Sequence, residues 1–289
     1  MSDVKPSTER IAEAFQLASP CRVCPRECMV DRPAGEKGYC GVGSSPLVAS
    51  SAPHFGEERV LVGSGGSGTI FLSGCNMLCV FCQNSDISHG LEGYPERPVR
   101  MVETMRRLAR RGCENINFVT PSHVAPWIMK AVREARLRGL GLPIVYNCGG
   151  YESVEMLKLL EGTVDVYMPD AKFLSAELGE RYANAADYPE RLRESLREMH
   201  RQVGDLQVED GVAVRGLMVR HLVMPSAYDD SRLVLEFLAE LSPGTAVNVM
   251  GQYRPLFRAH ECPEIDAPVD RGKVEELKDY AGELGLTVL

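Results

Sequence analysis

The stretch TIFLSGCNMLCVFCQN, residues 69–84, joins a short apolar run to three cysteines spaced Cys-x3-Cys-x2-Cys. The β-branched and aromatic residues of the run predict a buried strand over Thr69–Ser73. Cys75, Cys79 and Cys82 then stand in the loop that leaves this strand, called the cysteine loop (residues 75–82) below. Three thiolates so close together can hold three corners of an iron–sulfur cluster.

No fourth cysteine closes this set. The next one along the chain is Cys113, which precedes a strand of its own and therefore lies at the wrong end of the sheet. One iron of a cluster held by the loop is thus expected to stay open. The alternative interpretations are a zinc site or unrelated buried thiols, but structural zinc takes four protein ligands.

From residue 68 onward, short apolar runs alternate with amphipathic helical stretches, which is the pattern of βα units on a parallel sheet. Six such units are visible, and their periodicity fits a doubly wound sheet and a partial barrel equally well. Both architectures place the chemistry at the carboxyl ends of the strands. The predicted strands are Thr69–Ser73, Asn115–Thr120, Pro143–Asn147, Val164–Met168, Gly216–Val223 and Ala246–Met250.

The composition excludes several functional classes. The chain has 289 residues, 44% of them hydrophobic, and a net charge of −8, which argues against a nucleic-acid coat or an anionic membrane surface as the main partner. It has no apolar stretch long enough for a membrane span and no apolar signal core at its start, which favours a cytoplasmic location. Ten cysteines are too few for a disulfide scaffold, so clustered thiols are expected to bind metal.

Residues 1–67 are rich in Gly, Pro and Ser and show little periodicity, so we expect a small metal-stapled segment ahead of a barrel domain at 68–289. Its cysteines supply four thiolates and could close a site completely. Zinc and a second iron–sulfur cluster are both chemically reasonable there, with a structural metal slightly favoured. This four-cysteine motif consists of Cys21, Cys24, Cys28 and Cys40.

The cysteine loop and its strand resemble the radical S-adenosylmethionine (SAM) superfamily, and residues 74–76 and 82–84 are most similar to the branch around pyruvate formate-lyase activating enzyme. The resemblance implies an α/β fold, a partial (β/α)6 barrel with a small N-terminal Cys-rich segment. Similar N-terminal cysteine sets occur in an uncharacterised sub-branch of those relatives. Phe81 matches the aromatic residue that packs near the adenine of SAM in the family.

The function that the resemblance implies is a radical SAM oxidoreductase. A 4Fe-4S cluster on Cys75, Cys79 and Cys82 would bind SAM at its open iron and cleave it reductively to a 5′-deoxyadenosyl radical, which abstracts hydrogen from a substrate. Reduced flavodoxin or ferredoxin would supply the electron. The leading hypothesis is an activase of a glycyl-radical partner protein. The alternatives are an enzyme acting on a small molecule or peptide, and a non-catalytic metal or redox scaffold.

Polar residues after the second and third strands are candidate SAM contacts. Thr120 and Ser122 stand where activating enzymes usually carry Gly-Gly-Glu-Pro, and their hydroxyls could meet the methionyl ammonium. Ser122 could equally be the N-cap of the helix that runs through Trp127. Asn147 is a candidate contact to ribose or carboxylate, with a plain turn residue as the equal alternative. His123 is expected to be a packing residue.

The later strands supply the remaining candidates. Asp170 and Lys172 are similar to the Asp-x-Lys of activating enzymes, where the lysine pairs with the SAM carboxylate and the aspartate orients it or meets the substrate. Arg220 lies in an apolar run and needs a buried anionic partner, either the SAM carboxylate or Asp170. Asn248 takes the place of a His in activating enzymes and can bond a ribose hydroxyl without titrating. His221 alternates to the opposite face.

Overall fold

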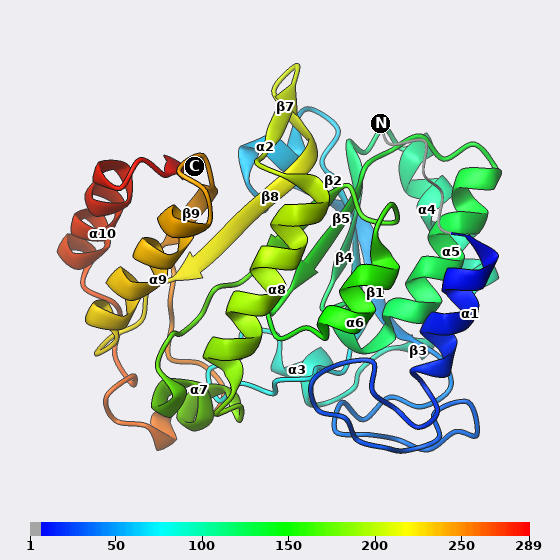
Figure 1. Cartoon of the computed structure of the whole chain (residues 1–289), viewed down its shortest axis with the longest axis horizontal. Helices are drawn as coiled ribbons and strands as arrows, with labels where there is room; N and C mark the ends of the chain where they lie inside the picture. Colours follow the sequence, from blue (N-terminus) through cyan, green and yellow to red (C-terminus); the bar gives the residue numbers. More distant parts are fainter. Residues whose placement is uncertain (1–6) are drawn as a thin grey trace.

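A computed structural model describes residues 7–289, and its sheet is built on six parallel strands that follow one another in space as they do in the chain (Figure 1). A doubly wound sheet would reverse its strand order, so this order gives a partial barrel. The expected α/β fold with a partial barrel is confirmed. The six strands are β2 (Ser67–Ser73), β4 (Asn115–Val119), β5 (Ile144–Cys148), β6 (Val166–Pro169), β8 (Val212–Leu222) and β9 (Ala246–Met250).

Short strands extend both edges of this sheet. β1 (Leu47–His54) pairs antiparallel with β2, and β3 (Tyr94–Pro95) pairs with β1. β10 (Thr287–Val288) lies parallel to β9 at the other edge. β7 (Gln207–Glu209) forms a hairpin with β8 around residues 210–211, as the Asp-Gly dipeptide predicts.

The helices pack on the outer side of the sheet (Figure 1). The helical spacing of apolar residues predicts these helices correctly, since the apolar faces of α5, α8 and α9 are buried. Ser153 caps α6, accepting a bond from the Met156 N–H at 3.4 Å. The helices are α1 (Thr8–Gln16), α2 (Arg59–Val62), α3 (Ser85–Ser88), α4 (Pro98–Arg110), η1 (Ser122–Val124), α5 (Ala125–Leu137), α6 (Val154–Leu160), α7 (Ala176–Ala183), α8 (Tyr188–Val203), α9 (Tyr228–Leu241), η2 (Ala259–Glu261) and α10 (Arg271–Glu283).

Two apolar cores result from the alternation of side chains along the strands. The larger core fills the space between sheet and helices. The smaller core lies inside the barrel, where Met218 of β8 and Val166 of β6 meet Leu61 of α2. Leu61 is fully buried, so α2 closes the end of the barrel opposite the strand ends.

We expected the chain to divide at residue 67, but two elements that precede this residue pack as part of the barrel domain. β1 and α2 belong by sequence to the N-terminal segment, yet β1 pairs with β2 along its length and α2 packs against β8. α2 has only four residues, and β1 carries mixed polar residues, so neither gives a periodic signal. The Cys-rich part proper is the loop region between α1 and β1.

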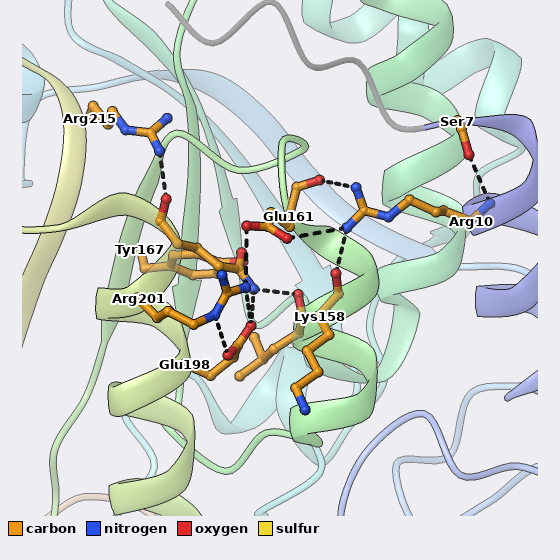
Figure 2. A network of polar contacts seen from close by, with 10 residues as sticks. Ser7, Arg10, Lys158, Glu161, Tyr167, Glu198, Arg201 and Arg215 are labelled. Atoms are coloured by element: carbon orange, nitrogen blue, oxygen red, sulfur yellow. Dashed lines mark hydrogen bonds and ion pairs between the residues drawn. The ribbon is translucent and has the colours of Figure 1, made fainter.

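A polar network ties helix α1 to the barrel, as Figure 2 shows. The Arg10 guanidinium donates to the carbonyl oxygens of Lys158 and Glu161 at the end of α6, at 2.5 and 2.9 Å. Arg201 of α8 lies 3.2 Å from the Glu161 carboxylate and pairs with Glu198. These contacts hold the start of the N-terminal segment against α6 and α8.

The loops that follow α1 lie on the lower side of the molecule in Figure 1, toward which the arrow of β8 points. They are therefore found at the end of the barrel from which the cysteine loop emerges. Within residues 7–289, no helix combines the length and the apolar character needed to cross a bilayer.

Candidate active site

The cysteine loop begins with a turn that only glycine fits. Gly74 has φ of +84°, and a Cβ there would lie 2.6 Å from the carbonyl oxygen of Cys40. The Gly74 N–H donates to the Ile87 carbonyl at 2.9 Å, and the Val80 N–H donates to the Tyr182 carbonyl at 3.0 Å. The loop is thus pinned at its start and near its end, and the four-cysteine motif lies directly beside it.

The three thiols of the loop share one electrostatic environment. Burial raises the pKa of Cys75 and raises that of Cys79 to about 12, while the Lys172 ammonium acts in the opposite direction on both. Cys82 is near enough to raise the pKa of the other two. The Lys172 ammonium thus partly offsets the effect of burial on the pKa values of Cys75 and Cys79, and the loop offers the donor type of an iron–sulfur cluster.

Asp170 and Lys172 follow β6 and form an ion pair at 2.5 Å. Their side chains are largely buried, at 28% and 13% exposure. Burial lowers the pKa of Lys172, but the Asp170 carboxylate outweighs this effect, so the net pKa lies above the ordinary value. Lys172 therefore stays charged beside the cysteine loop.

The loops after β2, β5 and β6 meet at this point. A Cβ at Gly149 would lie 2.6 Å from the Met77 sulfur, so the loop after β5 passes close against the cysteine loop. Tyr188 of α8 joins the other two loops: its hydroxyl accepts from the Lys172 N–H at 3.0 Å and lies 2.7 and 2.9 Å from the carbonyl oxygens of Asp170 and Gly149. Sequence reasoning missed Tyr188, because it reads as the first residue of an amphipathic helix.

Thr120 and Ser122 follow β4 but have different surroundings. Thr120 has φ of +60°, a left-handed conformation that is strained for a β-branched residue and is typical of functional sites. Ser122 is 2% exposed and donates its hydroxyl to Glu152. The expectation that Ser122 caps the helix is wrong, because the 3-10 turn η1 intervenes and α5 has no side-chain cap.

Glu152 is a buried carboxyl on the outer face of the sheet. It accepts from Ser122 and from the Tyr146 hydroxyl, the latter at 3.1 Å, and burial raises its pKa to about 7. Cys148 shares this environment and is 2% exposed in the outer core, so its thiol is packed as expected. Cys113 and Cys262 are buried in the same core.

Arg220 has a different anionic partner from those predicted. Its guanidinium pairs with Glu57 and, at 2.5 Å, with Glu58, rather than with Asp170. Burial raises the pKa of Glu58, but its bonds to Arg220 outweigh this effect and hold the net pKa below its usual range. The physical reason is the turn that leads into α2, which brings both carboxylates into the barrel from a segment with no periodic signal. The unmet charge of Arg220 was the one hint of such a partner.

Asn248 and Asn117 complete this interior cluster. The Asn248 amide donates to Glu58 Oε1 at 2.8 Å and the Asn117 amide donates to Glu57 Oε1 at 3.1 Å. Asn147 lies on the inner face of β5 and is 8% exposed. Three of the residues expected to contact SAM, which are Asn147, Arg220 and Asn248, therefore do project into the barrel.

The aromatic and imidazole candidates are packed. Phe81 is 5% exposed and lies 6.3 Å from the Phe173 ring and 6.0 Å from the Tyr253 ring. His123 and His221 are each 1% exposed, and burial lowers the pKa of their imidazoles to about 3 and about 4. Both therefore stay neutral, in agreement with their predicted packing roles.

The four-cysteine motif gathers beside the cysteine loop. Burial raises the pKa of Cys24 and Cys40, and each thiol is influenced by the others of the motif. None of the cysteines in the chain forms a disulfide. Across residues 7–289, no three His, Cys, Asp or Glu side chains converge as a ligand set for one metal ion. The donor chemistry of the motif fits a thiolate-bound metal, and both zinc and a cluster remain compatible with it.

Comparisons with known proteins identify the family of the chain. The sequence model of the radical SAM superfamily matches residues 69–216, just over half of the chain. The uncharacterized protein MJ0674 of Methanocaldococcus jannaschii is 31% identical over 291 residues, covering 97% of this chain and 79% of that protein.

Solved structures of Streptococcus suis SuiB share the fold at 11% identity. The structure titled as bound to precursor peptide SuiA has a TM-score of 0.50 and covers 74% of this chain and 46% of SuiB. The structure titled as bound to S-adenosylmethionine also has a TM-score of 0.50 and covers 77% and 45%. The chain spans less than half of the length of SuiB.

Proposed function

The chain belongs to the radical SAM superfamily, and on that premise we propose that it binds SAM at an iron–sulfur cluster on the cysteine loop and uses it to abstract hydrogen from a substrate. The observation that carries this proposal is the position of the Cys75, Cys79 and Cys82 loop beside the buried Asp170–Lys172 pair, at the carboxyl ends of the strands. This is where barrel enzymes place their chemistry.

Cys75, Cys79 and Cys82 would hold a 4Fe-4S cluster with one iron free of protein ligands. When bound, such a cluster supplies one electron to the SAM sulfonium, and cleavage of SAM then yields a 5′-deoxyadenosyl radical. Lys172 keeps a fixed positive charge beside the thiolates, held by Asp170.

The remaining residues would orient SAM. Lys172 would pair with a carboxylate, and Asn147 would meet ribose or carboxylate from inside the barrel. Arg220 and Asn248 would act through their cluster with Glu57 and Glu58. We further propose Phe81 as a wall near the adenine, and the strained Thr120 and neighbouring Ser122 as the part of the strand end that faces the methionyl group.

For the substrate, we propose an activating-enzyme-like role, with hydrogen abstracted from a backbone glycine of a glycyl-radical partner protein. The Asp170-x-Lys172 pattern after β6 supports it. A second candidate is a peptide or small-molecule substrate, supported by the four-cysteine motif packed against the barrel end, which would hinder a large partner. Reduced flavodoxin or ferredoxin is the proposed electron donor.

The four-cysteine motif is proposed to bind a structural metal, either zinc or a second iron–sulfur cluster. Metal analysis of a variant with alanine at Cys75, Cys79 and Cys82 tests this directly. One zinc per chain is expected for a zinc site, and iron with equivalent sulfide for a cluster. The absence of both zinc and iron from that variant would contradict the proposal.

The function is tested by anaerobic reconstitution with iron and sulfide, reduction with dithionite, and quantification of 5′-deoxyadenosine formed from SAM. At saturating SAM, the wild-type protein and Cys24→Ala are expected to form it, and Cys79→Ala is not. If the wild-type protein keeps an intact cluster but neither forms deoxyadenosine nor changes its EPR spectrum with SAM, the chain is a metal or redox scaffold. Adding candidate glycyl-radical proteins or peptides then separates the substrate classes.

A further inference from the structure

Arg26 extends from the four-cysteine motif to the cysteine loop. It lies between Cys24 and Cys28, and its Nε donates to the Asn76 carbonyl at 2.6 Å. Its Nη1 donates to the Asn184 carbonyl, at the end of α7, at 2.5 Å. Asn76 directly follows Cys75, so one guanidinium joins the proposed metal site to the loop that would hold the cluster.

Aromatic side chains fix the position of this guanidinium. It lies 4.1 Å from the ring centroid of Tyr39 and 5.1 Å from that of Tyr151, within the range of cation–π contacts. Tyr39 precedes Cys40, and its hydroxyl donates to the Met77 carbonyl at 3.3 Å. Residues from both ends of the four-cysteine motif thus contact the backbone of the cysteine loop.

Carbonyl groups of the cysteine loop accept hydrogen bonds from side chains, not from the backbone of a neighbouring strand. The Asn184 amide donates to the Leu78 carbonyl at 2.7 Å and to that of Met77 at 3.3 Å. Tyr182, two residues before Asn184, accepts the Val80 N–H. Arg26 therefore contacts the loop directly and also the α7 end that holds its far side. A fork of charged donors suits this bridging of two carbonyl groups.

We propose that Arg26 is a positioning residue through which metal bound at the four-cysteine motif holds the backbone of residues 76–80 in its SAM-binding conformation. Without metal, residues 21–40 lack the staple that fixes Arg26 and Tyr39, and the loop loses these donors. The inference rests on the proposed function for its effect on SAM, but the effect on loop order can be measured without SAM.

Hydrogen exchange of the reconstituted protein tests the effect on order. In Arg26→Ala, exchange at the Val80 amide is expected to be at least tenfold faster than in wild type. Arg22→Ala is the matched control, since Arg22 lies in the same motif, contacts Glu155 at 3.6 Å and is 42% exposed. Its exchange is expected to match wild type. Arg26→Lys keeps the charge but not the forked guanidinium, and its Val80 exchange rate is expected to lie between those of wild type and Arg26→Ala. This milder variant still tests the proposal if Arg26→Ala folds poorly.

The link to the metal is tested by combining variants. Cys24→Ala is expected to speed Val80 exchange as Arg26→Ala does, and the double variant is expected to add nothing further. Titrating SAM against the EPR spectrum of the reduced cluster gives a second readout. Half-maximal change is expected at a SAM concentration at least tenfold higher in Arg26→Ala than in Arg22→Ala.

Equal Val80 exchange in Arg26→Ala, Arg26→Lys and Arg22→Ala would overturn the proposal. Additive effects of Cys24→Ala and Arg26→Ala would overturn the link to the metal. If the wild-type cluster does not respond to SAM at all, the proposed function fails, while the exchange measurements still decide the role of Arg26.

Discussion

The Asp170–Lys172 pair shows how burial makes one charge depend on another. With both side chains largely buried, the 2.5 Å ion pair offsets a desolvation cost that neither residue could meet alone. The pKa of Lys172 is held above its ordinary value by Asp170. Lys172 therefore stays protonated beside the cysteine loop across the physiological pH range, with its charge balanced by Asp170.

Asp170→Asn is expected to lower the free energy of unfolding by about 3 kcal/mol, because it leaves a buried ammonium without its carboxylate. Urea denaturation measures the loss. Glu134→Gln is the matched control: it breaks the exposed 2.8 Å pair with Arg138 and should cost less than about 1 kcal/mol. Equal losses in both variants would contradict the role of burial.

Glu152 makes stability depend on pH in the opposite sense from a salt-bridged carboxyl. Burial raises its folded pKa to about 7, above the value of about 4.3 in an unfolded chain. The folded protein therefore holds this proton more tightly, and stability falls as pH rises from about 4.3 to 7. Glu152→Gln removes this contribution.

Urea denaturation of Glu152→Gln and wild type at pH 5 and pH 7.5 measures the contribution of Glu152 to the pH dependence of stability. The variant is expected to gain about 2.5 kcal/mol relative to wild type between the two pH values, the part of the shift from about 4.3 to about 7 that falls in this pH window. Parallel pH profiles would show that Glu152 titrates normally in the folded state.

Among the elements, the short helix α2 has an effect out of proportion to its length. It closes the barrel with Leu61 and brings Glu57 and Glu58 to Arg220 of β8. The sequence predicts that Arg220 needs an anion, since a charge within an apolar run must be paired. It could not predict which one, because a contact spanning more than 160 residues leaves no local pattern.

Arg220→Met is expected to destabilise the protein by about 3–5 kcal/mol, because two carboxylates then stay buried without a cation. Adding Glu57→Gln and Glu58→Gln should recover a substantial part of the loss, as neutral amides need no counter-charge. Urea unfolding of the single, double and triple variants measures this. A triple variant no more stable than Arg220→Met would contradict the assigned cluster.

The six parallel strands are well predicted from the sequence, since each coincides with one of the six apolar runs. Their order in space separates a partial barrel from a doubly wound sheet, and periodicity carries no information on it. The cysteine loop could be found because its spacing is local. Tyr188, Glu57 and the Ser122–Glu152 bond could not, because each depends on contacts between distant segments.

At the scale of the whole molecule, the four-cysteine motif and the cysteine loop form one end of the barrel. The carbonyl of Cys40 lies against Gly74, and Arg26 bonds to Asn76. The two proposed metal sites therefore share a wall, and their stabilities are expected to be linked.

Cys28→Ser is expected to lower the thermal midpoint of the metal-loaded protein by several degrees, because it removes a ligand of the proposed staple. Cys262→Ser is the control, a lone buried thiol with 8% exposure that is assigned no ligand role. A midpoint equal to that of the control, with unchanged metal content, would exclude a metal at the motif.

The central claim is that Cys75, Cys79 and Cys82 leave one iron open for SAM. Mössbauer spectroscopy of the ⁵⁷Fe-reconstituted Cys24→Ala variant, without SAM and with saturating SAM, tests it most directly, because the only cluster expected in that variant is the one on the loop. Binding at an open iron predicts that about one quarter of the iron signal shifts on adding SAM. A cluster spectrum that SAM leaves unchanged, or that survives Cys79→Ala, would contradict the claim.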